Sequence, residues 1–396
     1  MGGPKIFLSA GEASGEYYGA ELIAALQQLA PQADFFGLGG RRMEALGFRP
    51  IVRSEDVAVM GITEVVRHMP RIYREYRRLR ASVAAEKPDI AILIDFPDVN
   101  LSLARRLKRQ GVPVIYFVSP QLWAWKKYRI RSVQRYVDRM LTIFPFEERF
   151  YHDHGVDAEF VGHPLAEREP PAITRDEFAR QAGLDPSRTW IGLLPGSRGN
   201  EIRLNLPDMV RAGAMLGQNA EFLLPLASTL TGPQRDHIRA LLAELLAAES
   251  TPPHIVLVED ARAVLYHARA SIVASGTATV EAALIGNPFI VVYRISPLSY
   301  AVAKRVVDVP HVAMVNLIAG KRIVPELIQG DFTAPEVVSL LRPLLDNEEA
   351  RVRMQANLRR VGEMLRSEQS AVGRVAQIAC EMLRQSTPEE RLSQVP

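Results

Sequence analysis

The sequence predicts an α/β fold of two doubly wound, Rossmann-like parallel-sheet domains that face a central cleft. Three observations lead to this prediction. The chain has 396 residues, more than one ordinary hydrophobic core accommodates. Short apolar runs alternate with helical segments in both halves, as repeated βαβ units require. The segment 167–173 (EREPPAI), with paired prolines and charges, is typical of a linker between the halves.

The first predicted domain covers residues 1–166. Its strands are expected at 5–10, 35–38, 90–94, 114–118 and 140–144, and its helices at 19–29, 101–110 and 129–139. The run 90–94 (IAILI) is apolar at every position, which is typical of a parallel strand buried on both faces. A further helix is expected to begin at Pro70, because proline is favoured in the first helical turn.

The second predicted domain covers residues 174–333 and repeats the plan. Its strands are expected at 190–194, 222–226, 255–258, 270–274 and 289–292, and its helices at 208–216, 234–248, 261–268 and 279–285. The remaining segment, 334–396, has a helical pattern. Packing of this segment back on the first domain is one arrangement open to it.

Composition favours a cytoplasmic globular protein. Hydrophobic residues make up 47% of the chain and charged residues 23%, which argues against extensive disorder. Cys380 is the single cysteine, so no disulfide can form within the chain, and no Cys/His cluster has zinc spacing. No apolar run approaches the roughly 20 residues of a membrane span. The N-terminus lacks the apolar region and cleavage site of a secretory signal.

Positive charge is concentrated in one part of the chain. Residues 67–139 contain 17 Lys and Arg against 6 Asp and Glu, so the remainder of this +3 chain carries a net charge of −8. Such a segment favours an anionic partner, for which lipid headgroups, phosphate and nucleic acid are candidates. Trp123 and Trp125 lie beside Lys126 and Lys127, a combination that suits a membrane interface. Nucleic acid is disfavoured because no binding motif accompanies the charge.

Two polar segments follow predicted strands in the first half. Residues 9–16 (SAGEASGE) form a strand-to-helix turn whose glycines let backbone N–H groups approach a ligand, with Ser14 as a plain helix N-cap the alternative. Residues 94–100 (IDFPDVN) end a buried strand. Asp95 is the candidate general base, because partial burial raises the pKa of a carboxyl toward neutrality. Asp98 or Asn100 is expected to cap the following helix.

Two segments of the second half are suited to phosphate. Residues 194–201 (LPGSRGNE) present Arg198, whose guanidinium can bind phosphate in a bidentate manner. Residues 275–281 (SGTATVE) open a helix, so backbone N–H groups and the helix dipole favour an anion there. Glu281 could accept hydrogen bonds from a ribose. No Asp-x-Asp pair is available to hold a metal, so Arg198 and the helix start are expected to stabilise the leaving group.

The ordered set of motifs resembles the lipid-A-disaccharide synthases, bacterial glycosyltransferases of the GT-B fold, over nearly the whole chain. No single motif carries the resemblance. The motifs are AGEASGE from Ala10, MGITEV from Met60, IDFPDVN from Ile94, VSP from Val118, WAW from Trp123, FPFE from Phe144, VGHP from Val161, LPGSRGNE from Leu194, SGTATVE from Ser275, Asn316, and PELIQ from Pro325.

The resemblance implies transfer of 2,3-diacylglucosamine from its UDP derivative to the 6′-hydroxyl of 2,3-diacylglucosamine 1-phosphate (lipid X). The products are the β-1,6-linked lipid A disaccharide 1-phosphate and UDP. The resemblance also implies an inverting reaction without metal or cofactor, and a peripheral position on the anionic surface of the inner membrane of Gram-negative bacteria. The oligomeric state is left open, and a homodimer is compatible with the sequence.

The resemblance also assigns site residues. Asp95 matches the family's candidate base. The residues that match its donor and UDP site are Glu12, Ser14, Arg198, Ser275, Gly276, Thr277, Glu281, Asn316 and Gln329. Membrane and acceptor contacts are expected at Trp123, Trp125, Lys126 and Lys127. The alternatives are another GT-B enzyme, such as a UDP-sugar 2-epimerase or a transferase with a polyprenyl-linked acceptor, and a non-catalytic membrane-bound nucleotide-sugar binder.

Overall fold

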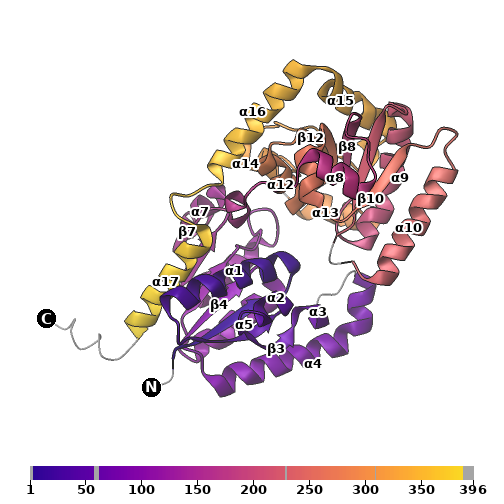
Figure 1. Ribbon diagram of the computed structural model, residues 1–396. Coiled ribbons are helices and arrows are strands. Elements are labelled where there is room, and N and C mark those ends of the chain that lie inside the picture. The colour runs from indigo at the N-terminus through magenta and orange to yellow at the C-terminus, as the bar shows by residue number, and fades with distance from the viewer. Residues whose placement is uncertain (1–2, 58–61, 228–229, 308, 387–396) are drawn as a thin grey trace. The chain divides into compact units, whose positions relative to one another are not determined.

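The computed structural model describes residues 3–57, 62–227, 230–307 and 309–386. The chain divides into two compact units, Met1–Glu167 with Leu365–Pro396 (unit 1) and Arg168–Met364 (unit 2) (Figure 1). Their boundary falls within the proline-containing segment 167–173. Met60 and Gly61 of the MGITEV motif lie outside the described residues.

Unit 1 contains a parallel sheet that is seven-stranded over the described residues, in the order β3-β2-β1-β4-β5-β6-β7. The strands are β1 (Lys5–Ala10), β2 (Asp34–Gly39), β3 (Arg49–Arg53), β4 (Ile90–Ile94), β5 (Val114–Phe117), β6 (Arg139–Thr142) and β7 (Ala158–Phe160). The α-helices are α1 (Ala13–Leu29), α2 (Arg41–Glu44), α3 (Ser54–Val57), α4 (Ile62–Glu86), α5 (Pro97–Arg109), α6 (Ile130–Tyr136), α7 (Pro145–His152) and α17 (Ala371–Ser386). Short 3-10 turns cover η1 (Lys127–Arg129) and η2 (Pro164–Glu167).

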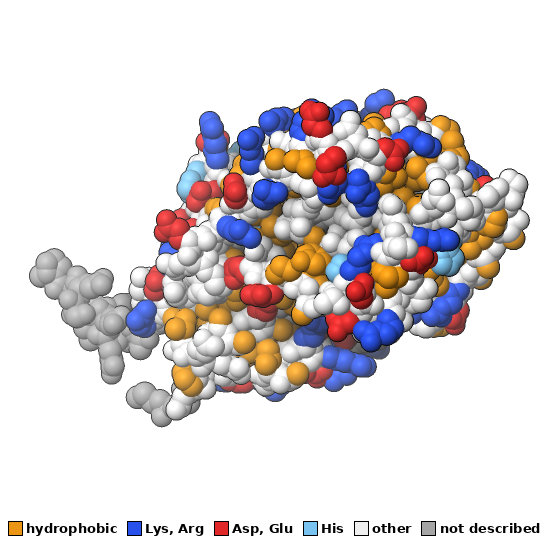
Figure 2. Space-filling view, turned by 45° about the horizontal axis from the view of Figure 1, so that its top comes forward, with side chains coloured by type: hydrophobic (Ala, Val, Ile, Leu, Met, Phe, Trp, Pro, Cys, Tyr) orange, Lys and Arg blue, Asp and Glu red, His pale blue; other side chains and the backbone are white. Residues whose placement is uncertain are grey.

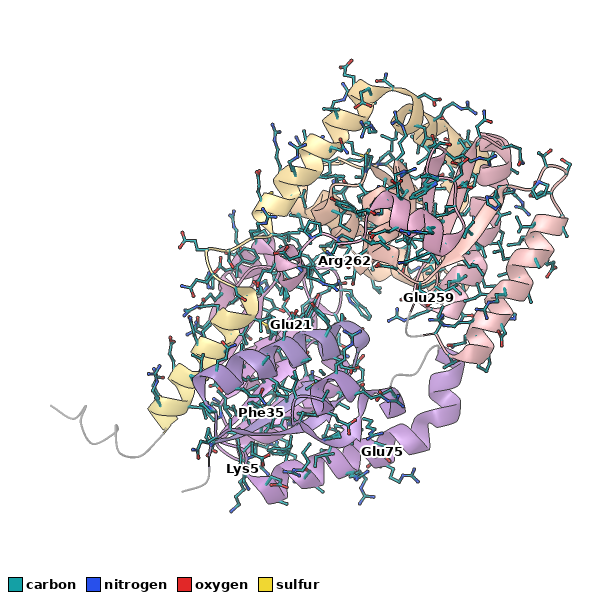
Figure 3. The ribbon with its side chains drawn as sticks, viewed as in Figure 1. Lys5, Glu21, Phe35, Glu75, Glu259 and Arg262 are labelled. Atoms are coloured by element: carbon teal, nitrogen blue, oxygen red, sulfur yellow. The ribbon has the colours of Figure 1, made fainter. Side chains whose placement is uncertain are left out.

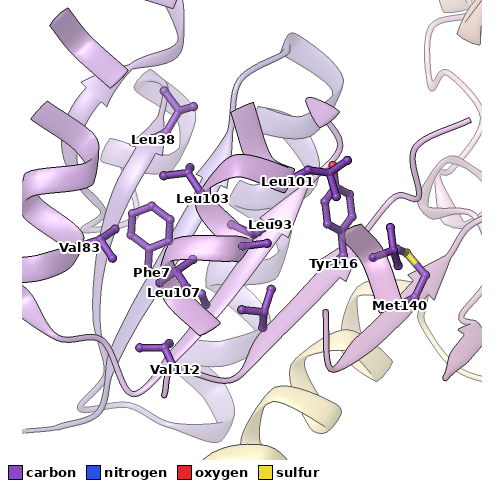
Figure 4. Close-up of a cluster of buried hydrophobic side chains, with 14 of the residues drawn as sticks. Phe7, Leu38, Val83, Leu93, Leu101, Leu103, Leu107, Val112, Tyr116 and Met140 are labelled. Atoms are coloured by element: carbon purple, nitrogen blue, oxygen red, sulfur yellow. The ribbon is translucent and has the colours of Figure 1, made fainter. Parts of the chain in front are cut away.

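Helices cover both faces of this sheet, which explains why β4 is apolar and buried at every position. Phe7, Leu93 and Tyr116 point from the sheet toward α4 and α5, where they form one buried cluster with Leu103 and Leu107 (Figure 4). On the other face α1 and α17 pack against each other and against β4. Unit 1 therefore takes part of its core from the C-terminal end of the chain.

Unit 2 contains a second parallel sheet, six-stranded over the described residues, in the order β10-β9-β8-β11-β12-β13. The strands are β8 (Thr189–Leu194), β9 (Ala220–Pro225), β10 (His254–Val258), β11 (Ala270–Ala274), β12 (Phe289–Tyr293) and β13 (Glu326–Ile328). The helices are α8 (Arg175–Ala182), α9 (Gly199–Leu216), α10 (Gly232–Ala247), α11 (Ala261–His267), α12 (Thr277–Ile285), α13 (Pro297–Val306), α14 (Met314–Ala319), η3 (Gln329–Asp331), α15 (Ala334–Asp346) and α16 (Glu348–Met364). The helix α9 packs against α15, and α12 packs against both α11 and α16.

The strand order reverses at the same place in both sheets. In unit 1 this switch point lies between β1 and β4, and in unit 2 between β8 and β11. Connections from two such strands leave in opposite directions, so a crevice opens at their carboxyl ends, where doubly wound sheets bind ligands. Lys5, at the amino end of β1, marks the opposite edge of the unit 1 sheet (Figure 3). A ligand site is therefore expected at the carboxyl ends of the strands.

Several helices begin earlier than the sequence predicts. α1 begins at Ala13 instead of 19, α5 at Pro97 instead of 101, and α9 at Gly199 instead of 208. Small, polar or proline residues in these first turns hide the helical periodicity, although proline at N1 is compatible with a helix start. The helix start expected at Pro70 is also wrong, since α4 begins at Ile62. A proline removes one hydrogen bond, which a long helix can tolerate when tertiary contacts hold it.

The strands β3, β7 and β13 lie at sheet edges. The sequence does not predict them, because they are short and contain proline or charged residues. Within the described ranges, every helix is too short or too polar to cross a bilayer. On the face that Figure 2 shows, Lys and Arg side chains lie among Asp and Glu side chains rather than in one block.

Candidate active site

Asp95 directly follows β4 at the switch point of unit 1 and is partly buried. Glu12, the residue before α1, lies on the other side of this switch point, and its like charge acts on Asp95. Burial raises the pKa of Asp95 to about 7, and the charge of Glu12 adds to this rise. The Phe96 N–H acts in the opposite direction by stabilising the carboxylate. A carboxyl with this pKa can accept a proton from a substrate hydroxyl at neutral pH.

The segment 95–100 does not cap its helix in the expected way. Phe96 is the residue before α5, and Pro97 occupies the first turn. Asn100 lies inside α5, fully buried, and its amide donates to the carbonyl oxygens of Ile94 and Asp95. The cap expected at Asp98 or Asn100 is therefore wrong, because Pro97 is suited to the first helical position and Asn100 turns inward. Ser14 is likewise not an N-cap, because it lies within α1.

Asp98 instead anchors the segment that carries the paired tryptophans. Its carboxylate accepts from Arg129 and lies 3.6 Å from the ammonium of Lys126. Although partial desolvation opposes the shift, these two cations hold the pKa of Asp98 below its usual range. Lys126 also lies 4.2 Å from the ring centroid of Trp125. The tryptophan segment is therefore tied to the helix that follows Asp95.

The two tryptophans of that segment have different surroundings. Trp123 is partly buried, its indole N–H donates to Glu147 at 3.0 Å, and its ring packs against Phe146 at 5.0 Å. Burial raises the pKa of Glu147 to about 7. Trp125 and Tyr128 are 40% and 70% exposed. Lys127 is also exposed. Outward contact from this segment is therefore open to Trp125 and Tyr128 rather than to Trp123.

In unit 2, Arg198 follows β8 at the switch point and precedes α9. The loop before it turns at Gly196, whose φ of +123° is open to glycine but strained for other residues. Glu201 closes this loop, because its carboxylate accepts from the Ser197 N–H at 3.2 Å and lies 3.3 Å from the Arg198 guanidinium. The Arg198 side chain remains 57% exposed. Its guanidinium is therefore held near the loop and still accessible to an anionic ligand.

Ser275, Gly276 and Thr277 follow β11, on the other side of this switch point. Gly276 is exposed, with a φ of +150°, and α12 begins at Thr277. The first N–H groups of a helix have no acceptor within the helix, and the helix dipole makes this end positive. The hydroxyl of Ser275 donates to the Val312 carbonyl at 3.1 Å. This turn combines exposed backbone with a helix start, which suits a phosphate.

Glu281, one turn further along α12, does not present a free carboxylate. It lies 3.3 Å from Arg168 and 3.4 Å from Arg262, the latter labelled in Figure 3. Arg262 also donates to the Glu169 carbonyl at 2.8 Å. Glu281 thus connects α12 to α11 and to the start of unit 2, and a ribose hydroxyl would have to share it with two guanidinium groups.

Asn316 is fully buried and uses its whole amide within the protein. Its Oδ1 accepts from the N–H groups of Ile323 and Val324, and its Nδ2 donates to the Val324 carbonyl and to Glu326. Glu326 in turn accepts from the N–H groups of Val312 and Ala313. Because the Val312 carbonyl also accepts from the Ser275 hydroxyl, this network orders the segment beside the 275–277 turn. The amide of Asn316 is therefore not presented to a ligand.

Gln329 lies at the carboxyl end of β13 with φ at +54°, and its side chain donates to the Ile295 carbonyl at 3.3 Å. Its own carbonyl accepts from Arg294 at 3.4 Å. Tyr293, at the end of β12, has a pKa raised by burial and by the charge of Glu201, while Arg198 lowers it. Tyr293 therefore lies in the electrostatic field of the Arg198 loop.

Tyr293 and Glu326 are neighbours of the candidate site that sequence reasoning missed. Tyr293 is the last residue of β12, and Glu326 is the first residue of the short strand β13. A polar side chain at the end of an apolar strand is the signal that could have found them. Within the described ranges, no group of three or more His, Cys, Asp or Glu side chains is arranged to hold a metal ion. Unit 1 thus has a carboxyl that is suited to act as a base, and unit 2 has groups that are suited to bind an anion.

Comparison with protein families gives one match that covers nearly the whole chain. The model of the family described as lipid-A-disaccharide synthetase matches residues 6–379. The lipid-A-disaccharide synthase of Acidobacterium capsulatum is 65% identical over 395 residues, which cover 98% of this chain and 99% of that protein. The enzyme of the same name from Koribacter versatilis is 50% identical over 376 residues, or 94% of this chain and 97% of that protein.

Solved structures with low sequence identity share the fold. A UDP-GlcNAc 2-epimerase from Neisseria meningitidis bound to UDP-GlcNAc is similar with a TM-score of 0.62 at 13% identity, covering 96% of this chain and 100% of that chain. The calicheamicin glycosyltransferase CalG4 is similar with a TM-score of 0.58 at 15% identity, covering 98% of this chain and 100% of that chain. The predicted GT-B fold, with two parallel-sheet α/β domains, is confirmed by these likenesses and by the two sheets.

Proposed function

Because the chain belongs to the lipid-A-disaccharide synthase family, a family of glycosyltransferases, we propose that it transfers 2,3-diacylglucosamine from its UDP derivative to 2,3-diacylglucosamine 1-phosphate. The acceptor is the 6′-hydroxyl, and the products are the β-1,6-linked disaccharide 1-phosphate and UDP. The proposed reaction is a single, inverting displacement that requires no metal. The observation that carries the proposal is the partly buried carboxyl of Asp95 at the switch point of unit 1.

Asp95 is the proposed general base. It removes the proton of the acceptor hydroxyl while that oxygen attacks the anomeric carbon of the donor. Support comes from the raised pKa of Asp95, about 7, since a base of this strength is deprotonated in part at neutral pH and still binds a proton well. Glu12 contributes by keeping this pKa high. Ser14, partly buried in the first turn of α1, is the neighbouring candidate for a donor contact.

Unit 2 is proposed to bind the UDP portion of the donor. Arg198 offers an accessible guanidinium for the diphosphate, and the N–H groups at the start of α12 offer a second anion contact. Both act on the negative charge that develops as UDP leaves, which is the role that a metal has in other transferases. Gln329 and Glu281 are proposed to contact the nucleoside, while Asn316 and Glu326 order the segment next to Ser275.

Peripheral binding to an anionic bilayer is proposed for the segment around Trp125. Its support is the exposure of Trp125 and Tyr128 beside Lys126 and Lys127. Replacing Trp125 and Tyr128 by alanine should reduce co-sedimentation with vesicles that contain anionic lipid, because both apolar contact and cation placement are lost. Tyr266→Ala is the matched control, since Tyr266 is 48% exposed in unit 2. Equal binding by the double variant and the wild type would contradict this proposal.

The reaction is tested by incubating the protein with UDP-2,3-diacylglucosamine, with and without 2,3-diacylglucosamine 1-phosphate, and identifying the lipid product by mass. We expect disaccharide 1-phosphate and one UDP per disaccharide, only when both substrates are present. A parallel incubation with UDP-GlcNAc alone separates the alternative of a 2-epimerase. If UDP-GlcNAc alone gives an epimerised UDP-sugar, and the incubation with both acylated substrates gives no disaccharide, the protein is a 2-epimerase and the proposal is wrong.

A further inference from the structure

Asn100 connects the two strand ends that flank the switch point of unit 1. Its Oδ1 accepts from the Ser9 hydroxyl at 2.6 Å, at the end of β1. Its Nδ2 donates to the Ile94 carbonyl at 3.1 Å and to the Asp95 carbonyl at 2.8 Å, at the end of β4. The side chain has no exposed surface, so water cannot replace these bonds without a rearrangement.

The backbone of Asp95 needs such support. Asp95 and Phe96 both have φ near +48°, a left-handed conformation that residues other than glycine keep only where their surroundings hold them. The Asp95 carbonyl accepts a second bond, from the Tyr116 hydroxyl at 2.6 Å. The Asp95 N–H donates to the Phe117 carbonyl at 3.0 Å. The peptide groups on both sides of the Asp95 Cα are therefore fixed, and with them the direction of the Cα–Cβ bond that carries its carboxyl.

A close packing contact joins the same two loops. A Cβ on Gly11 would lie 2.3 Å from the ring of Phe96, so the ring rests directly on the backbone of Gly11. Gly11 precedes Glu12, and Phe96 follows Asp95. The hydrogen bonds of Asn100 and this contact thus keep the Glu12 loop and the Asp95 turn in one arrangement.

We propose that Asn100, assisted by Tyr116, is a positioning residue for the Asp95 carboxyl. It holds Asp95 in its left-handed backbone conformation and keeps the carboxyl beside the Glu12 loop. This inference rests on the proposed role of Asp95 as the base. Neither Asn100 nor Tyr116 contacts the reacting atoms in this account, and each acts through the Asp95 carbonyl.

Loss of the Asn100 amide should therefore affect the chemical step in a specific way. The titratable groups that face Asp95 are Glu12 on the loop after β1 and Tyr116 on β5. If the Asp95 turn relaxes toward solvent, burial and the Glu12 charge act on the carboxyl less strongly, so its pKa falls. The acid limb of the pH profile of kcat then moves to lower pH, and kcat at its plateau falls because the base is misplaced.

The test compares Asn100→Ala with Asn287→Ala in the full-length protein. Asn287 is a matched control, since it is 3% exposed and donates to the Ala268 carbonyl at 2.8 Å, at the amino end of the unit 2 sheet. We expect Asn100→Ala to lower kcat by about 10- to 100-fold, with the KM of the UDP-sugar nearly unchanged and the acid limb shifted to lower pH. Asn287→Ala should lower Tm and leave kcat and the acid limb in place.

Tyr116→Phe provides a milder variant that keeps the buried ring and removes one hydroxyl. It should shift the acid limb in the same direction with a smaller loss of kcat, and it decides the question if Asn100→Ala does not fold. Wild-type kcat and an unmoved acid limb in both variants, with Asp95→Asn inactive, would overturn the inference and leave the proposed function intact. Full activity of Asp95→Asn would instead show that Asp95 is not the base, and the inference about Asn100 would fall with that assignment.

Discussion

The same burial that raises the pKa of Asp95 to about 7 makes its ionised form unfavourable for folding. An acid whose pKa is raised in the folded state stabilises that state fully below its unfolded pKa of about 4, and the contribution is lost as pH rises through 7. Glu12 adds to the effect, because its like charge repels the Asp95 carboxylate. The candidate base is thus a source of instability at neutral pH.

Asp95→Asn should accordingly stabilise the protein at pH 8, by roughly 1–3 kcal/mol, while it removes activity. The difference in Tm from the wild type should shrink as pH falls and should vanish near pH 4, where both side chains are neutral. Thermal unfolding of both proteins between pH 4 and 8 measures this. Two parallel curves of Tm against pH would show that Asp95 is not desolvated in the folded protein.

At the residue scale, sequence patterns predict that Asp95, Arg198 and the 275–277 turn each follow an apolar strand, and in the structure they follow the carboxyl ends of β4, β8 and β11. They could not reveal the partners of these residues. The inward turn of Asn100 depends on Ser9, 91 positions away, and the two guanidinium groups on Glu281 come from other elements. Long-range hydrogen bonds of this kind leave no local periodicity in the sequence.

Among the elements, the loop between β8 and α9 depends on a single backbone conformation. Gly196 has φ at +123°, and a Cβ there would lie 2.5 Å from the Glu201 carboxylate. Gly196→Ala should therefore displace Glu201 and loosen the loop that holds Arg198. We expect the KM of the UDP-sugar to rise by about 10-fold and the Tm to fall only slightly.

Gly232→Ala is the matched control for this substitution. Gly232 begins α10, has no atom within 4 Å of an added Cβ, and lacks the positive φ of Gly196. Its KM should equal that of the wild type. Equal KM values for all three proteins would mean that the Arg198 loop does not bind the donor.

Element prediction succeeded where the hydrophobic pattern is strong. The bounds predicted for the strands 5–10, 90–94 and 270–274 agree with the structure, because each is a largely apolar and buried run. The predicted starts of α1, α5 and α9 are wrong, because the loop continues into each helix and the residue before the helix makes no side-chain cap. The residues that make these turns suitable for binding are the residues that hide the helix.

At the scale of the whole molecule, unit 1 is completed by a helix that lies more than 200 residues from the rest of it along the chain. Arg374 of α17 forms an ion pair with Glu159 at 2.6 Å across 215 positions, and Ser367 donates to the Val161 carbonyl. The buried face of α17 packs on α1, the helix that begins beside Glu12. The stability of unit 1 therefore depends on residues 365–386.

Ala376→Asp should expose this dependence, because Ala376 is fully buried in α17 and an unpaired charge there costs several kcal/mol. Gln377→Asp introduces the same charge at the neighbouring exposed position. We expect a lower Tm and early proteolysis within unit 1 for Ala376→Asp, and wild-type behaviour for Gln377→Asp. Equal stability of the two variants would contradict the assignment of α17 to the core of unit 1.

The assignment of Asp95 as the base is tested by the rate of disaccharide 1-phosphate formation by Asp95→Asn and by Asp89→Asn. Both substitutions remove one carboxylate next to β4, but Asp89 lies at its amino end and is exposed. We expect that Asp95→Asn lowers kcat by roughly 10²–10⁴ while UDP still binds, and that Asp89→Asn keeps the wild-type rate. A wild-type rate for Asp95→Asn would contradict that assignment.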